Sequence, residues 1–179
     1  MHEKKARTRE RILDAATSAL IRHGPAEPSV GEVMGAAGLT VGGFYAHFES
    51  KDALMFEAYC QLLGKRRELL RQLDSTLPAY ERRSLAAAFY LSRRHRDSQH
   101  DACPLPSTLS EMNRLPESFR AELGRHLELM AVELSGCPED ADKALADLAL
   151  MVGGLALARA LGPGELSDRI LRAAKSAVI

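Results

Sequence analysis

The chain has 179 residues, with 24 Lys and Arg balanced by 24 Asp and Glu, so its formal net charge is zero. This length allows one or two small domains with a sizeable core, and the balanced charge gives no whole-chain argument for a nucleic-acid partner. Three cysteines, an odd number spread along the chain, argue against a disulfide framework.

The first predicted element is a helix over residues 4–23, whose apolar residues recur at helical spacing. The first eleven residues carry five bases against two acids. A basic N-terminal arm of this kind suits contact with phosphates, and Lys5 and Arg7 are its candidate DNA contacts. The alternative for each of these residues is a solvated, frayed chain end.

Residues 29–48 predict two short helices joined by a tight turn. Ser29 and Glu32 have the spacing of a capping box at the start of the first helix. Gly38 can adopt the left-handed conformation that ends it, and Thr40 is a favourable N-cap for the second. This is the helix-turn-helix pattern, in which the second helix enters a DNA groove. The alternative is a structural hairpin that binds no nucleic acid.

The rest of the chain also has the pattern of helices, so the fold class is all-α. We expect a long fourth helix, capped by Ser50 and reaching about Leu77, to connect the helix-turn-helix to the remainder. Proline and glycine breaks, with a polar loop over 97–106, divide the remaining residues into helices over 79–94, 107–113, 116–134, 139–161 and 165–178. We predict a DNA-binding domain over 1–50 and a ligand-binding and dimerisation domain over 51–179.

The last two predicted helices carry broad apolar surfaces, and Gly153 and Gly154 would let another helix approach closely. One interpretation is an ordinary core hairpin, and the other is a homodimer in which two such hairpins form a four-helix bundle. We favour the homodimer, because one short recognition helix reads few base pairs and two-fold symmetry doubles the contacts.

The N-terminus is charged and lacks the apolar stretch of a signal peptide. The longest uncharged apolar run, residues 148–158, is shorter than the roughly 20 residues that cross a bilayer. We therefore expect a cytoplasmic protein with no membrane association.

The segment from about Thr8 to Ala58 resembles the DNA-binding domain of the TetR family of bacterial repressors. The matching residues are Arg-Ile-Leu-Asp-Ala-Ala at 11–16, Gly24, Ala-Ala-Gly-Leu-Thr at 36–40, Phe-Tyr-Ala-His-Phe at 44–48, and Ser-Lys-Asp-Ala-Leu at 50–54. The resemblance implies a homodimer that binds a double-stranded DNA operator and carries a divergent effector domain.

By this resemblance and by position, small and polar residues of the second helix and its flanks are the candidate DNA contacts. The predicted set is Lys5, Arg7, Ser29, Thr40, Val41, Gly42, Gly43, Tyr45, His47 and Lys51. The alternatives are a half-buried ring for Tyr45 and a satisfied polar residue at a helix end for His47. Many members of the family have a base at position 41 or 42, and this chain has none there.

Cys103-Pro104-Leu105, at the start of a short predicted helix, is the candidate effector site. A thiol near a helix N-terminus can have a depressed pKa, and His95 or His100 would depress it further if close. Asp101 would oppose thiolate formation. The alternative is a small buried side chain in an apolar pocket.

The Cys-Pro-Leu motif resembles that of a TetR branch whose cysteine senses electrophiles or oxidants, and a related branch binds flat phenolic ligands. Ala102 replaces the usual glycine before the cysteine. The predicted ligand or sensor residues are Cys103, His100, Leu105 and Phe89.

The favoured hypothesis is a homodimeric repressor that responds to a small molecule or an electrophile. The alternatives are a small thiol-dependent helical enzyme using Cys103 with His100, and a helical adaptor without DNA binding. We predict no catalytic residue, no cofactor and no metal site. His95, His100 and Cys103 form too small a group for a zinc site without a second cluster, and His95-Arg96-Asp97 lacks the other motifs of a kinase.

Overall fold

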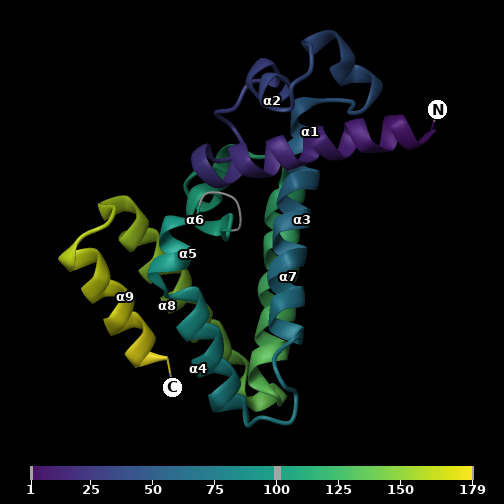
Figure 1. The fold of residues 1–179 in the computed structure, drawn as a ribbon. Coiled ribbons are helices and arrows are strands. Elements are labelled where there is room, and N and C mark those ends of the chain that lie inside the picture. The colour runs from purple at the N-terminus through teal and green to yellow at the C-terminus, as the bar shows by residue number, and fades with distance from the viewer. Residues whose placement is uncertain (1, 99–101, 179) are drawn as a thin grey trace.

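The computed structural model describes residues 2–98 and 102–178, which are helical throughout apart from the connecting segments and contain no strand (Figure 1). The elements in chain order are α1 (His2–His23), α2 (Val30–Ala36), the 3-10 helix η1 (Val41–Ala46), α3 (Lys51–Arg71), α4 (Ala79–Tyr90), α5 (Arg93–Asp97), α6 (Leu105–Thr108), η2 (Leu109–Arg114), α7 (Glu117–Ser135), η3 (Pro138–Asp140), α8 (Ala141–Leu161) and α9 (Glu165–Ala177). The all-α fold class is confirmed.

The N-terminal unit of α1, α2 and η1 lies at one end of the long helices α3 and α7. α1 lies across one end of α3, and α3 runs side by side with α7 (Figure 1). α8 packs against α7 on one side and α9 on the other. The first core cluster contains Phe44 and Leu20 from the N-terminal unit together with Tyr59, Phe119 and Leu155 from the rest. The apolar core therefore continues across the predicted domain boundary at residue 50.

The turn between α2 and η1 forms as its residues predict. The Oγ of Ser29 accepts from the backbone N–H of Glu32 at 3.2 Å, and a Glu32 carboxylate oxygen accepts from the Ser29 N–H at 2.7 Å. Both bonds of the capping box are thus present. Gly38 has φ +66°, the left-handed conformation that ends α2.

Replacing Gly38 with alanine should lower the free energy of unfolding by about 1–2 kcal/mol, because an L-residue is strained at this φ. A Cβ there would also lie 3.1 Å from the Arg11 guanidinium. The matched control is Gly35→Ala, since a Cβ at Gly35 meets nothing within 4 Å and the residue lies inside α2. We expect that control to gain about 0.5–1 kcal/mol. Urea unfolding of both variants measures their free energies of unfolding. Changes of the same sign in Gly38→Ala and Gly35→Ala would contradict the prediction.

The second helix of the motif differs from the prediction, because it is a 3-10 helix rather than an α-helix. Thr40 has the extended conformation of an N-cap, but its hydroxyl makes no capping hydrogen bond. Phe44 is fully buried, and its ring stacks on that of Phe48 at 6.0 Å. These two rings fix η1 to the core in place of regular α-helical bonding.

Several predicted boundaries were wrong. α3 ends at Arg71 rather than near Leu77, although Ser50 caps it by accepting from the Ala53 N–H at 3.0 Å. The predicted helix over 79–94 is divided after Tyr90. Ser92 caps the separate helix α5, its Oγ accepting from the His95 N–H at 3.1 Å. The predicted helix over 107–113 starts at Leu105 and becomes 3-10 from Leu109.

Helix α8 is unusually apolar. Within the described residues it alone is long and apolar enough to cross a membrane by length and composition, with a mean hydropathy of 1.7, and a buried core helix passes the same test. Gly154 allows the predicted close approach, since a Cβ there would lie 2.9 Å from the Cβ of Ala174 in α9. A Cβ at Gly153 would meet nothing within 4 Å, so that glycine makes no close helix contact within the chain.

Most of the apolar residues that favoured a dimer face pack inside the chain instead. The buried members of that set are Leu148, Met151, Leu155, Leu171, Ala174 and Val178. The same hairpin also exposes apolar side chains, which we call the α8–α9 stripe: Leu145, Leu157, Leu161 and Leu166. The hairpin therefore contributes to the core and also presents exposed apolar side chains.

Candidate functional site

The exposed face of η1 carries the predicted DNA contacts. Val41 is 51% exposed and Tyr45 is 74% exposed. The Tyr45 ring packs edge-on against Phe44 at 5.2 Å, so the buried ring orients the exposed one. Thr40 and Gly42 are exposed as well. These residues form one outward, exposed surface.

Other predicted contacts lie near this surface with varied surroundings. Gly43 and His47 are half-buried, and His47 Nδ1 is enclosed without a hydrogen-bond partner among the described residues. The Lys51 ammonium group donates to the Ala26 carbonyl at 2.6 Å. Ser29 is exposed, but its hydroxyl is already used by the capping box. Ser29 and Lys51 therefore hold the motif together as well as flanking it.

The basic arm is helical rather than extended. Lys5 and Arg7 lie exposed on the first turns of α1. Two further bases of the same segment are structural. Arg9 pairs with Glu57, the Nη1 to Oε1 distance being 2.6 Å, and lies over the Phe48 ring. Arg11 donates to the carbonyl of Ala37, at the end of α2, at 2.6 Å. Lys5 and Arg7, together with Lys4, thus remain the exposed bases of this arm.

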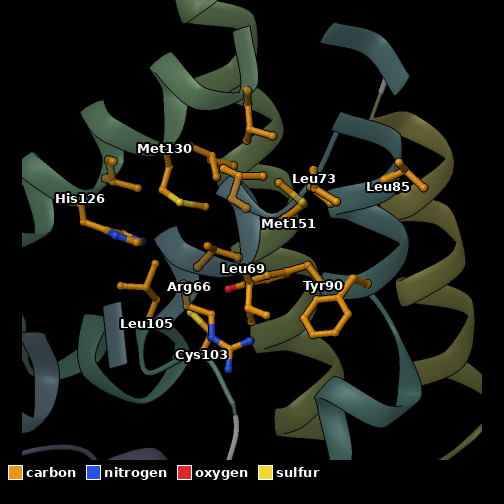
Figure 2. A pocket seen from close by; sticks show the side chains of 17 residues that line it. Arg66, Leu69, Leu73, Leu85, Tyr90, Cys103, Leu105, His126, Met130 and Met151 are labelled. Carbon is orange, nitrogen blue, oxygen red and sulfur yellow. The ribbon is translucent and has the colours of Figure 1, made fainter. Parts of the chain in front are cut away.

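A cavity of about 180 Å³ lies between α3, α4, α7 and α8 (Figure 2). Its lining is mostly apolar. The lining residues are Arg66, Leu69, Leu70, Leu73, Leu85, Ala86, Phe89, Tyr90, Cys103, Leu105, His126, Leu127, Met130, Leu134, Leu148, Met151 and Val152. Three predicted ligand residues, Cys103, Leu105 and Phe89, are therefore brought together, whereas His100 lies outside the described residues.

Cys103 is only 1% exposed, and burial raises the pKa of its thiol, although the nearby Tyr90 hydroxyl opposes this. This direction is opposite to the depressed pKa that the position near a helix N-terminus suggested. His95 Nε2 accepts from the backbone N–H of Cys103 at 2.9 Å, while its Nδ1 lies 2.8 Å from the Tyr90 carbonyl.

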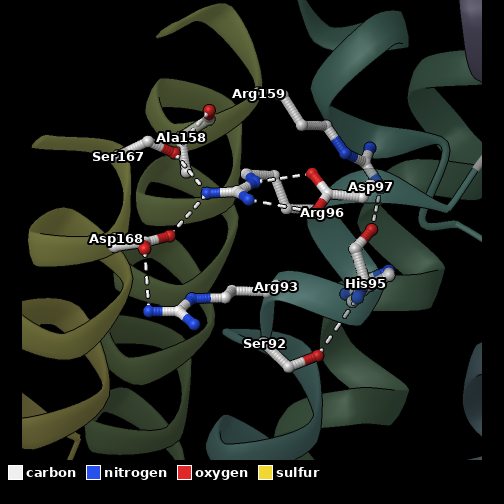
Figure 3. A network of polar contacts seen from close by, with 9 residues as sticks. All are labelled: Ser92, Arg93, His95, Arg96, Asp97, Ala158, Arg159, Ser167 and Asp168. Atoms are coloured by element: carbon white, nitrogen blue, oxygen red, sulfur yellow. Dashed lines mark hydrogen bonds and ion pairs between the residues drawn. The ribbon is translucent and has the colours of Figure 1, made fainter. Parts of the chain in front are cut away.

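The segment around Cys103 is attached to α8 through Arg159. The Arg159 guanidinium donates to the carbonyl of Cys103 at 3.0 Å. It also donates to the carbonyl of His95 at 3.1 Å (Figure 3). Nearby, Arg96 of α5 donates to Asp168 of α9 at 2.8 Å. One wall of the cavity is therefore held to the α8–α9 hairpin by ionic and hydrogen-bonded contacts.

His126 is a lining residue that the sequence analysis did not identify. It is 3% exposed, and Arg67 Nη1 donates to its Nδ1 at 3.0 Å. The same Arg67 nitrogen lies 3.2 Å from Glu122, which also accepts from Arg125 at 2.8 Å. Burial, followed by the charges of Arg67 and Arg125, lowers the pKa of His126 to about 4. The imidazole is therefore neutral near pH 7.

This depressed pKa should make stability depend on pH. An unfolded histidine has a pKa of about 6.5, so the folded state binds fewer protons and loses stability as the pH falls from about 6.5 to 4. Between pH 7 and pH 5 we expect His126 to account for a loss of about 2 kcal/mol. Urea unfolding of the wild type and of His126→Gln at both pH values isolates this contribution. Equal pH dependence in the two proteins would contradict it.

Comparisons with known proteins support the interpretation of the N-terminal unit. Residues 12–58 match the sequence model described as "Bacterial regulatory proteins, tetR family". A curated relative, the uncharacterised HTH-type transcriptional regulator YerO of Bacillus subtilis, is 29% identical over 102 residues, covering 54% of this chain and 34% of the relative. The chain thus spans about a third of that relative's length.

Solved structures match nearly the whole chain. A TetR transcriptional regulator from Legionella pneumophila is 25% identical, with a TM-score of 0.76 and 94% of each chain covered. Reduced E. coli NemR has a TM-score of 0.81 at 19% identity, covering 96% of this chain and 94% of its own. A TetR-family regulator from Agrobacterium tumefaciens has a TM-score of 0.81 at 20% identity, covering 96% and 97%. At these low identities the last two likenesses show a shared fold.

Proposed function

Because this chain belongs to the TetR family of bacterial transcriptional regulators, we propose that it is an effector-responsive repressor that binds a palindromic operator as a homodimer. The observation that carries the proposal is the outward face of η1. Val41 and Tyr45 are exposed on a short helix that buried Phe44 fixes to the core. A recognition helix needs this combination of free side chains and a rigid base.

The α8–α9 stripe supports the proposed homodimer. Leu157, Leu161 and Leu166 are 58%, 53% and 55% exposed on adjacent helices. Pairing this surface with a second copy would bury it in a four-helix bundle and remove the apolar area from water. A dimer would present two η1 surfaces to half-sites roughly 34 Å apart.

The cavity supports the proposed effector response. Arg66, Leu69 and Leu70 lie on α3, the helix that begins beside η1 and ends between the other cavity helices. A ligand that binds one orientation of α3 better than another shifts the population of DNA-competent dimers. We propose a small molecule as the effector and the cytoplasm as the location.

The test is a mobility-shift titration on the DNA flanking the protein's own gene, at several salt concentrations. We expect binding without added effector, with log affinity falling linearly against log salt concentration, because basic residues release counterions from phosphates. Salt-insensitive binding, or no binding without effector, would contradict the proposal.

The double variant Tyr45→Phe with Lys51→Ala should bind the operator about tenfold more weakly in the same assay, because each change removes one donor to phosphate. Tyr45 is 74% exposed, so the removal of its hydroxyl should not disturb packing. Unchanged binding and unchanged regulation would favour a helical adaptor without DNA binding. The third hypothesis, a thiol-dependent enzyme, finds no support in Cys103, whose thiol is buried with a raised pKa.

A further inference from the structure

We propose that the cavity binds a small, uncharged, mainly apolar molecule of single-ring size, whose one carbonyl or ether oxygen accepts a hydrogen bond from Nε2–H of His126. The inference names the ligand class of the cavity. It rests on the proposed function only in that ligand binding would change operator affinity. It can be tested without DNA.

The neighbours of His126 determine which of its nitrogens faces the ligand. A guanidinium only donates, so Nδ1 of His126 must accept from Arg67 at 3.0 Å, and the ring proton is then on Nε2. No other hydrogen bond of this ring is formed within residues 2–98 and 102–178. The imidazole, 97% buried, extends from α7 toward the space between Met130 and Leu105 (Figure 2). A buried donor without a partner favours a ligand that supplies an acceptor.

The charges around the cavity favour a neutral ligand. His126 is uncharged near pH 7, since burial and the adjacent arginines lower its pKa to about 4. Arg67 is paired with Glu122, and Arg66 has its own interactions within the protein. At His126 a carboxylate would therefore lose its hydration without gaining a cation, because the imidazole is neutral. An ammonium group would find no acceptor there, because Nδ1 already accepts from Arg67.

The size and lining of the cavity limit the ligand further. An apolar cavity of about 150 Å³ is sufficient to hold benzene, and this one measures about 180 Å³. Leucines and methionines make up most of its wall. A six-membered ring with one short polar substituent fits both the volume and the donor at His126.

Three probes of similar shape test the inference by NMR titration of the full chain: acetophenone, ethylbenzene and benzoate. Acetophenone carries one neutral acceptor, ethylbenzene carries none, and benzoate is anionic. We expect acetophenone to bind about tenfold more tightly than either of the others, as one buried hydrogen bond implies. Long-range ¹H–¹⁵N spectra of the imidazole should show the Nε2–H tautomer in the free protein and a shift of that nitrogen with acetophenone.

Variants at the donor provide the matched control. His126→Leu should bind acetophenone and ethylbenzene equally, whereas His126→Gln, which retains an N–H donor, should keep a preference for acetophenone. Equal affinities in the wild type, tightest binding of benzoate, or no binding of acetophenone would overturn the inference, and none of these results bears on operator binding. If acetophenone binds as expected but leaves operator affinity unchanged, the inference stands and the proposed effector response fails.

Discussion

Replacing Val41 with glutamate should weaken operator binding about 100-fold while leaving the fold intact. Val41 is 51% exposed on the outward face of η1, so a longer polar side chain meets no packed neighbour. If that face docks on a duplex, the new carboxylate lies against phosphates, and repulsion of like charges across an interface costs several kcal/mol. A 100-fold loss corresponds to about 2.7 kcal/mol.

The matched control for this variant is Val132→Glu. Val132 is 68% exposed and lies on α7, outside the helix-turn-helix unit. The two variants add the same charge at exposed positions, and both should have the wild-type melting temperature. Only Val41→Glu should lose operator binding in a mobility-shift assay. Its loss should shrink as salt is added, because exposed charges are screened. Equal operator affinity of the two variants would show that η1 does not face DNA.

Replacing Glu122 with leucine should lower the free energy of unfolding by about 3–5 kcal/mol, because it removes the acid from a buried ion pair. Glu122 and Arg67 have side chains only 8% and 11% exposed. Without Glu122, the buried Arg67 keeps His126 as a partner but loses its neutralising charge. Breaking one side of such a pair is far more destabilising than replacing the whole pair by apolar residues.

Glu128→Leu is the control for this second experiment, because Glu128 lies on the same helix and is exposed. We expect its effect to remain within about 0.5 kcal/mol. Urea unfolding at pH 7 compares the two variants. A similarly small effect of Glu122→Leu would mean that the Arg67 charge is solvated, and the inferred tautomer of His126 would lose its support.

Local signals predicted most of the fold. The capping box of Ser29 and Glu32 and the left-handed Gly38 depend only on residues within one turn of each other, and all three form as expected. The break after Tyr90 had a comparable signal in Ser92, a good N-cap, but no glycine or proline lies between residues 79 and 97 to mark a helix end. The 3-10 form of η1 depends on how Phe44 and Phe48 fit the core, which no local pattern specifies.

The cavity was only partly predictable. Cys103 was singled out by its motif, but its burial results from helices distant in sequence, so its raised pKa could not be inferred. Arg66 had a usable signal, because it interrupts the apolar spacing of Leu62, Leu69 and Leu73 along the predicted fourth helix. His126 had none, since its role depends on Arg67, 59 residues earlier in the chain.

The uninterrupted length of α3 has a mechanical consequence. Its 21 residues, at 1.5 Å per residue, make a rod of about 31 Å. If the cavity end is the pivot, a tilt of about 6° displaces the Lys51 end by about 3 Å, close to the 3.4 Å rise of one base step. A molecule no larger than a substituted ring, bound beside Leu69 and Leu73, would then move the two η1 surfaces of a dimer out of register with their half-sites on the duplex.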